Sequence, residues 1–354
     1  MPNTLDILIP HYHENASVVK PLLDSIALQQ AIDFAKIGVI ICHDGSEPNI
    51  NDSDNLGNYY PSKTQSKEFD LYDDMGIGGN YSIVADYQFG IKQIHIPHGG
   101  VSAARNAALD TSEAEYVMWC DCDDIFSSVC GLWLIFREIK YGVFDGMISQ
   151  FTEEIRRENG ETIFTAHEKD STFVHGKVWR RQYLLDNQIR WNESLTIHED
   201  SYFNILAQSF SENIKYCPIS FYLWKWRDDS VCRHDKKYIL KTFNNLIDSN
   251  EALVKEFQRR ERDHDAEFYV VSMVFTAYYT MNKPEWINQD NIEYRDSTEK
   301  RFAEYYKAYR SVWQGATMEN KMKVSNHVRY EQVQEGMWME TQTIDQWLSR
   351  VEAL

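Results

Sequence analysis

Two short apolar segments separated by an amphipathic stretch constrain the fold of this chain most strongly. Residues 5–10 (LDILIP) and 37–42 (IGVIIC) have the length and aliphatic content of buried strands. Between them, residues 16–30 repeat apolar side chains at helical spacing. Strands without apolar–polar alternation are buried on both faces, as in a parallel sheet that helices cover. We therefore predict an α/β fold with a mostly parallel sheet, with further strands at 91–96, 116–120, 144–151 and 216–226 and helices at 101–109 and 132–141.

Polar residues follow the predicted strands at their carboxyl ends. Tyr12 follows the first strand, Asp44 follows the second, and the acidic stretch 121–124 (DCDD) follows the strand at 116–120. In open α/β sheets, ligands bind beyond the carboxyl ends of the strands. These polar residues therefore predict one shared binding site at this edge of the sheet.

The acidic stretch carries oxygen ligands that suit a divalent cation. In an extended backbone, residues two apart point to the same side, so Asp121 and Asp123 would project together, with Asp124 entering the next loop. Carboxylates at this spacing suit Mg²⁺ or Mn²⁺, usually with diphosphate oxygens completing the shell. The alternative is a plain acidic turn, because Asp is a good turn residue.

Charge and composition narrow the class of protein. The 354 residues are 43% hydrophobic, which is ample for a packed core and suggests either one large domain with an additional segment or two domains. The formal net charge of -18 argues against nonspecific binding to nucleic acid or anionic membranes. No apolar run is long enough to span a bilayer, residues 1–10 do not resemble a signal peptide, and the six cysteines show no C-x-x-C spacing. We predict a cytoplasmic protein without transmembrane segments.

Four motifs occur in order along the first part of the chain. They are the loop at 7–14 (ILIPHYHE), the turn at 42–46 (CHDGS), the segment at 98–109 (HGGVSAARNAAL) that contains the helix at 101–109, and the acidic stretch ending YVMWCDCDD at 116–124. Together they resemble the family 2 glycosyltransferases, which have the GT-A fold, a Rossmann-like sheet flanked by helices. The resemblance runs from Leu5 to about Arg233 and implies an inverting enzyme that uses a nucleotide-sugar donor, with a UDP-sugar favoured.

The resemblance also implies roles for individual residues. The nucleotide sugar would be bound by Pro10, Tyr12, Asp44, Arg105, Asp121 and Asp123. The cofactor, Mn²⁺ or Mg²⁺, would be held by Asp121, Asp123, Asp124 and a more distant His234. Arg227 and Arg233 are candidates for phosphate contacts. A guanidinium such as that of Arg105 could meet phosphate or pair with nearby carboxylates.

A second acidic pair lies further along the chain, at Glu199 and Asp200. It resembles the family's Glu-Asp pair at the start of a helix, which implies that Asp200 is the catalytic base and places Glu199 and His198 on the acceptor side. A helix N-terminus favours an acidic side chain. The alternative is that Asp200 merely caps the helix.

The remaining chain changes character. Residues 153–170 are charged and predict a hairpin or surface loop, and residues 174–181 lead into a helix that ends at Leu185. Helical spacing recurs at 238–262, 265–281, 297–313 and within 330–351. We predict a catalytic domain at 1–234 and a helical domain at 235–354 that binds the acceptor or forms a homodimer, with a long polar segment at 47–93 of unassigned role.

The predicted function is metal-dependent transfer of a sugar to an acceptor hydroxyl, on a polysaccharide or another glycan. A hydrolase that uses Asp200 with an upstream acid, and a non-catalytic carbohydrate- or nucleotide-binding protein, are the alternatives. Glycosylation of a modified nucleic-acid base is a weaker alternative, because the net negative charge of the chain disfavours binding to nucleic acid. A sugar-phosphate nucleotidyltransferase would need Gly and Arg in the loop after the first strand, and HYHENAS has neither.

Overall fold

A computed structural model describes residues 2–14, 16–45, 87–157, 159–227, 242–287, 292–333 and 342–354. The chain divides into two compact units, Met1–Asp228 and Asp229–Leu354. Two predicted site residues, Arg233 and His234, lie outside the described residues, as does most of the long polar segment.

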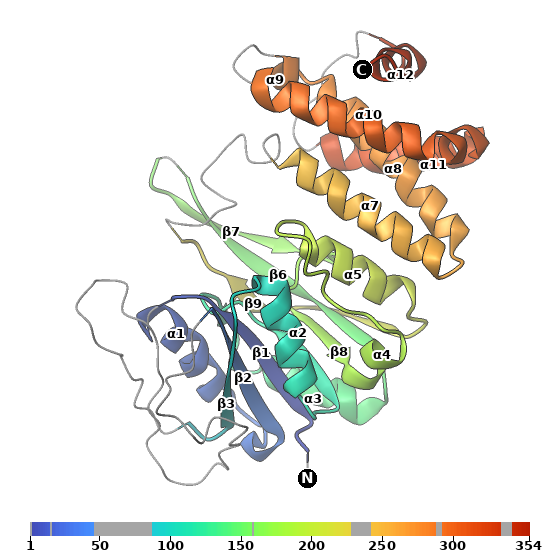
Figure 1. Ribbon diagram of the computed structural model, residues 1–354. Coiled ribbons are helices and arrows are strands. Elements are labelled where there is room, and N and C mark those ends of the chain that lie inside the picture. Colours follow the sequence, from blue (N-terminus) through green and yellow to red (C-terminus); the bar gives the residue numbers. More distant parts are fainter. Residues whose placement is uncertain are drawn as a thin grey trace. The chain divides into compact units, whose positions relative to one another are not determined.

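The first half of unit one is a parallel sheet (Figure 1). Its strand order is β3-β2-β1-β4, and every neighbouring pair is parallel. Helices α1 (Ala16–Ala27) and α2 (Val101–Thr111) make two of the connections. The strands are β1 (Leu5–His11), β2 (Ile37–Asp44), β3 (Gly90–Ile96) and β4 (Tyr116–Trp119). The predicted α/β fold is confirmed, and these elements begin and end within a few residues of their predicted bounds.

Beyond β4 the sheet is mixed. In the described part of the chain nine strands form one sheet, which continues in the order β4-β8-β6-β9-β5, with β7 paired to β6. β9 runs parallel to β6, and the other pairs on this side are antiparallel. The strands are β5 (Ile125–Phe126), β6 (Gly146–Arg156), β7 (Thr162–His167), β8 (Lys177–Arg180) and β9 (Ile214–Trp224). The hairpin considered for residues 153–170 is present as β6 and β7.

Strand β8 was not predicted, because contacts with residues outside the strand stabilise it and its own sequence has no strand pattern. Lys177 is buried and pairs with Asp170 at 3.1 Å and with the carbonyl of Phe173. The ring of Trp179 packs where a side chain on Gly146 would stand, 2.5 Å from an added Cβ. A short strand with a buried lysine therefore fits between β4 and β6, and α4 (Arg181–Asp186) begins only after it.

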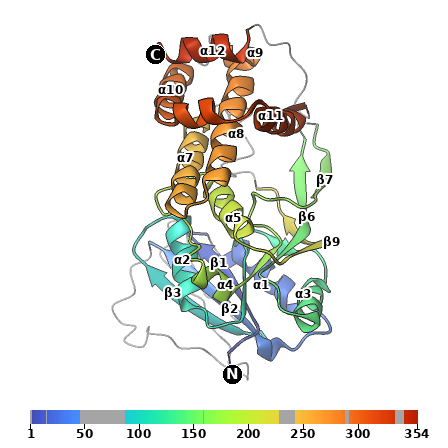
Figure 2. The same ribbon diagram turned by 90° about the vertical axis from the view of Figure 1, so that its right-hand side faces the viewer.

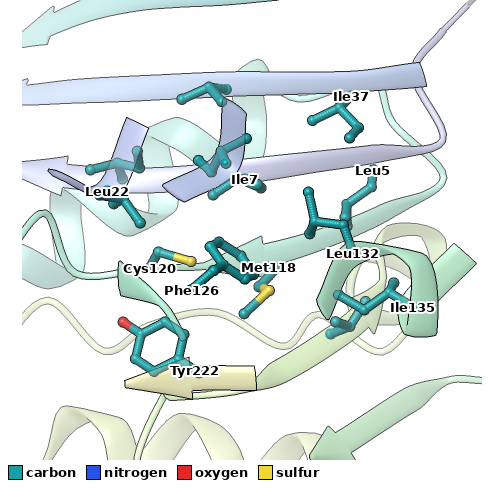
Figure 3. Packing of buried hydrophobic residues seen from close by; sticks show 14 of the residues in the cluster. Leu5, Ile7, Leu22, Ile37, Met118, Cys120, Phe126, Leu132, Ile135 and Tyr222 are labelled. Carbon is teal, nitrogen blue, oxygen red and sulfur yellow. The ribbon is translucent and has the colours of Figure 1, made fainter. Parts of the chain in front are cut away.

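One hydrophobic cluster packs helices α1 and α3 against the sheet. Figure 3 shows Leu22 of α1 and Leu132 of α3 (Gly131–Tyr141) over Ile7 of β1 and Met118 of β4. All four side chains are fully buried. Burying a side chain of this size contributes about 1.5–3 kcal/mol. The strand ends that carry the polar residues are thus held by a rigid core.

Unit two is helical (Figure 2). Its buried aromatic side chains include Trp347, whose ring centroid lies 5.2 Å from that of Phe302 and 5.6 Å from that of Tyr278. These aromatic side chains are therefore core residues of a helical unit. Its described helices are α7 (Phe243–Arg259), α8 (Asp263–Met281), α9 (Pro284–Ile287), α10 (Ile292–Gly315), α11 (Met318–Val333) and α12 (Ile344–Val351). In the ranges that the structure describes, no helix combines the length and hydropathy needed to cross a bilayer.

Candidate active site

The carboxyl ends of the parallel strands border a cavity of about 350 Å³. Residues from the ends of β1, β2 and β4 line it together with the start of α2. All six residues predicted to bind the donor are among its lining residues: Pro10, Tyr12, Asp44, Arg105, Asp121 and Asp123. The structure therefore brings together positions that are more than a hundred residues apart in the sequence.

Asp44 at the end of β2 organises one side of this cavity. Its carboxylate accepts hydrogen bonds from the backbone N–H groups of Gly99 and Gly100, at 2.7 and 2.9 Å, and from Nδ1 of His98 at 2.9 Å. Gly100 has a φ of 85°, a conformation that glycine adopts without strain. The ring of Tyr12, 48% exposed, stacks on His98 with centroids 4.8 Å apart. This side thus offers an aromatic face beside a carboxylate.

Arg105 lies at the centre of the site. Its guanidinium donates to Oδ1 of Asp200 at 2.6 Å, to Oε1 of Glu199 at 3.0 Å and to Oδ1 of Asp121 at 3.1 Å. The residue is 3% exposed, and its guanidinium carbon lies 4.3 Å from the ring centroid of Trp191. Of the two partners considered from the sequence, carboxylates and phosphate, the structure shows carboxylates.

Asp200 is partly buried, with its side chain 20% exposed, and it lies beside Arg105 rather than at a helix cap. Helix α5 (Glu199–Ser209) has His198 as its N-cap residue, with a φ of 64°, so the capping alternative for Asp200 is wrong. Oδ2 of Asp200 accepts a hydrogen bond from the N–H of Val174 at 3.3 Å. Burial raises the pKa of Asp200 to about 8, with Arg105 lowering it and Glu199 raising it. A carboxyl group with this pKa can exchange a proton near neutral pH.

The acidic turn after β4 holds two differently placed carboxylates. Asp123 faces the cavity and pairs with Arg227 at 3.1 Å, so the arginine predicted to meet phosphate meets this carboxylate. Asp124 is fully buried and accepts hydrogen bonds from the hydroxyl of Tyr222 at 2.7 Å and from the N–H of Lys225 at 2.9 Å. Burial raises the pKa of Asp124 well above its usual range, and the neighbouring carboxylates add to the shift.

A histidine that the sequence analysis did not select completes this cluster. One ligand atom each from Asp121, Asp124 and His175 lies within 4.8 Å of the other two. His175 precedes β8, so its position depends on a strand that no pattern predicted. Two oxygen ligands and one imidazole nitrogen at this separation fit a divalent cation.

Part of the chain matches a known protein family. Residues 71–203 match the model of Glycosyl transferase family 2. A curated relative, "Cholesterol galactosyltransferase" of Borreliella burgdorferi, is 24% identical over 307 residues, which cover 77% of this chain and 83% of the relative.

Solved structures share the fold. The crystal structure of S. aureus TarS 1–349 superposes with a TM-score of 0.56 at 14% identity and covers 95% of this chain and 93% of that one. TarS 1–349 in complex with UDP-GlcNAc gives a TM-score of 0.55 at 15% identity, with coverage of 95% and 93%. At this identity the likeness establishes the fold.

Proposed function

We propose that this chain, whose residues 71–203 match the model of Glycosyl transferase family 2, is a glycosyltransferase that moves a sugar from a nucleoside-diphosphate sugar to an acceptor hydroxyl with inversion at the anomeric carbon. One observation carries this proposal. A buried arginine joins the acid at the start of α5 to the acidic turn after β4, at the edge of a cavity that six predicted donor-binding residues line.

The cavity suits a nucleoside-diphosphate sugar. The ring of Tyr12 and the carboxylate of Asp44 offer a stacking face and a hydrogen-bond acceptor, which suit the base and the ribose. A UDP-sugar is the favoured donor, because the TarS structures with the same fold include complexes with UDP and with UDP-GlcNAc. Arg227 pairs at 3.1 Å with Asp123, which lines the cavity, and we propose that it contacts the diphosphate of the bound donor.

We propose that the acidic turn at 121–124 contributes to the binding site of a divalent cation, Mn²⁺ or Mg²⁺. When bound, such an ion neutralises the charge that develops on the leaving diphosphate. Asp121 and Asp123 line the cavity, so both carboxylates face the position where the diphosphate would lie. His234, which the sequence also assigns to the ion, lies outside the described residues.

Asp200 is the proposed general base. It removes the proton of the acceptor hydroxyl as that oxygen attacks the anomeric carbon from the face opposite the diphosphate. The new bond joins the acceptor oxygen to the anomeric carbon, and the bond to the diphosphate oxygen breaks. Arg105 fixes the carboxylate of Asp200 through the 2.6 Å hydrogen bond. Glu199 and His198 lie at the start of the same helix and are proposed to face the acceptor.

The proposed acceptor is a hydroxyl of a polysaccharide or another glycan. A sterol hydroxyl is the second candidate, because the curated relative is named as a cholesterol galactosyltransferase. Incubation with a labelled UDP-sugar and either a glycan mixture or cholesterol in detergent distinguishes the two. Release of free sugar without either acceptor would favour the hydrolase alternative instead.

Donor binding is the first test. We expect one nucleotide diphosphate or nucleotide sugar to raise the melting temperature in the presence of Mn²⁺ or Mg²⁺ but less with EDTA, because a ligand that binds the folded state stabilises it by mass action. Asp121→Asn should lose the metal-dependent part of this shift, and Asp110→Asn, at an exposed ion pair, should keep it. No shift with any nucleotide in the presence of metal would contradict the proposal and favour a protein that keeps only the fold.

The pH dependence tests the base. Only the carboxylate form of Asp200 accepts a proton, and its pKa is raised to about 8. We therefore expect kcat/KM for the donor to rise about tenfold per pH unit below pH 8 and to level off above it. Glu199→Gln should move the midpoint to lower pH, because Glu199 raises the pKa of Asp200. A flat profile from pH 6 upward would point to a base with an ordinary carboxyl pKa.

A further inference from the structure

His175 has the surroundings of a metal ligand rather than of a core residue. Its side chain is 2% exposed, and among the described residues its Nδ1 atom has no hydrogen-bond partner. Nδ1 lies 3.6 Å from Oδ2 of Asp124, which is beyond hydrogen-bond distance. Leaving a buried polar atom unbonded costs about 1–3 kcal/mol, so the position calls for an explanation.

The groups around this nitrogen are held in fixed orientations. The imidazole stacks on the ring of Tyr222, with centroids 5.1 Å apart, and on that of Phe173, with centroids 5.7 Å apart. The Tyr222 hydroxyl also donates to Oδ2 of Asp124, and the N–H of Lys225 donates to Oδ1. Outer partners that orient ligands in this way are a regular part of metal sites.

Asp123 is placed differently. Its carboxylate lines the cavity and is paired with Arg227 at 3.1 Å, whereas Asp124 and His175 are not among the residues that line the cavity. Asp121 both lines the cavity and has a carboxylate oxygen close to the ligand atoms of Asp124 and His175. Asp124 and His175 therefore lie behind the cavity lining, on the inner side of the acidic turn. Asp121 is the one member of this ligand set that also lines the donor cavity.

We propose that the divalent cation of this enzyme is bound by Asp121, Asp124 and Nδ1 of His175, and that Asp123 is left to the donor and Arg227. This inference rests on the proposed function only for the role of the ion. An imidazole ligand favours transition-metal ions, whereas Mg²⁺ prefers oxygen ligands in octahedral geometry. The site therefore selects Mn²⁺ over Mg²⁺, and that selectivity depends on one nitrogen atom.

The test measures ion binding rather than transfer. Pulsed electron paramagnetic resonance of Mn²⁺ added to the full chain, with and without UDP, should show coupling to an imidazole nitrogen. His175→Phe should abolish this coupling, weaken Mn²⁺ binding by about tenfold or more, and narrow the preference for Mn²⁺ over Mg²⁺. The aromatic surroundings of His175 should accept a phenyl ring without loss of fold, which the melting temperature checks.

The control is a second histidine in the same aromatic group. His167 stacks on Phe151 at 4.5 Å and pairs with Glu153, outside the ligand set. His167→Phe should leave both the nitrogen coupling and the Mn²⁺ affinity unchanged. Absence of nitrogen coupling in the wild type under both conditions, or equal Mn²⁺ affinity of wild type and His175→Phe, would overturn the proposal. Nitrogen coupling without any sugar transfer would keep this ion site and refute the proposed function instead.

Discussion

Replacing Asp200 by Asn should lower sugar transfer by about 10²- to 10⁴-fold, the usual contribution of a general base. The amide keeps the shape of the side chain, and its oxygen can still accept from Arg105, but it cannot take a proton. The donor cavity is lined by other residues, so donor binding should remain. The measurements are the steady-state rate with saturating donor and the donor affinity by calorimetry.

The stability of this variant separates catalysis from folding. The pKa of Asp200 in the folded chain is raised to about 8, well above that of an ordinary aspartate in the unfolded chain. Between these pH values the unfolded chain gives up this proton more readily, so burying the charged group costs stability at neutral pH. Asp200→Asn removes that cost, and its melting temperature should equal or exceed that of the wild type. Transfer that survives in Asp200→Asn but is lost in Glu199→Gln would move the base to Glu199.

Of the substitutions discussed, Arg105→Gln should destabilise the fold most. We expect it to lower the free energy of unfolding by about 3–5 kcal/mol. Its guanidinium is buried and bridges Asp121, Glu199 and Asp200. The substitution leaves three neighbouring carboxylates without this cation, and their mutual repulsion is no longer offset. Urea-induced unfolding, followed by tryptophan fluorescence, measures the loss.

Two further variants make this prediction specific. Arg190→Gln removes an arginine that forms a two-hydrogen-bond pair with Asp110 at the surface, and it should cost at most about 1 kcal/mol. Arg105→Lys keeps the charge, but a single ammonium cannot reproduce the planar fork that serves three carboxylates. It should fall between the wild type and Arg105→Gln. A loss below 1 kcal/mol for Arg105→Gln would show that the carboxylates do not depend on this residue.

The parallel half of the fold was predictable because its signals are local. β1 and β2 are short aliphatic runs bounded by polar residues, and α2 has helical spacing over its whole length. β8 was not predictable, because it has four residues and begins with a lysine. That lysine is tolerated in the sheet only because Asp170 is placed beside it, and this is a tertiary contact.

In the site, too, local sequence signals predicted some features, whereas others depend on tertiary contacts. Asp121 and Asp123 carry a spacing signal, and their position at a strand end follows from the topology. The partners of Arg105 lie 16, 94 and 95 residues away, so nothing in the local sequence distinguishes pairing with these carboxylates from contact with phosphate. His175 has no signal of its own, since its position beside Asp124 depends on the unpredicted strand that follows it.

The order in which the chain is synthesised bears on when this site can form. The groups that hold Asp124, the hydroxyl of Tyr222 and the N–H of Lys225, come 98 and 101 positions later in the chain. On the ribosome the parallel strands can therefore pair well before the acidic turn has its supports. Until β9 emerges, the carboxylates remain hydrated, and a nascent chain can hold a nearly finished sheet with no ordered reaction centre. A shortened version of unit one would have to extend through residue 225 to keep this centre.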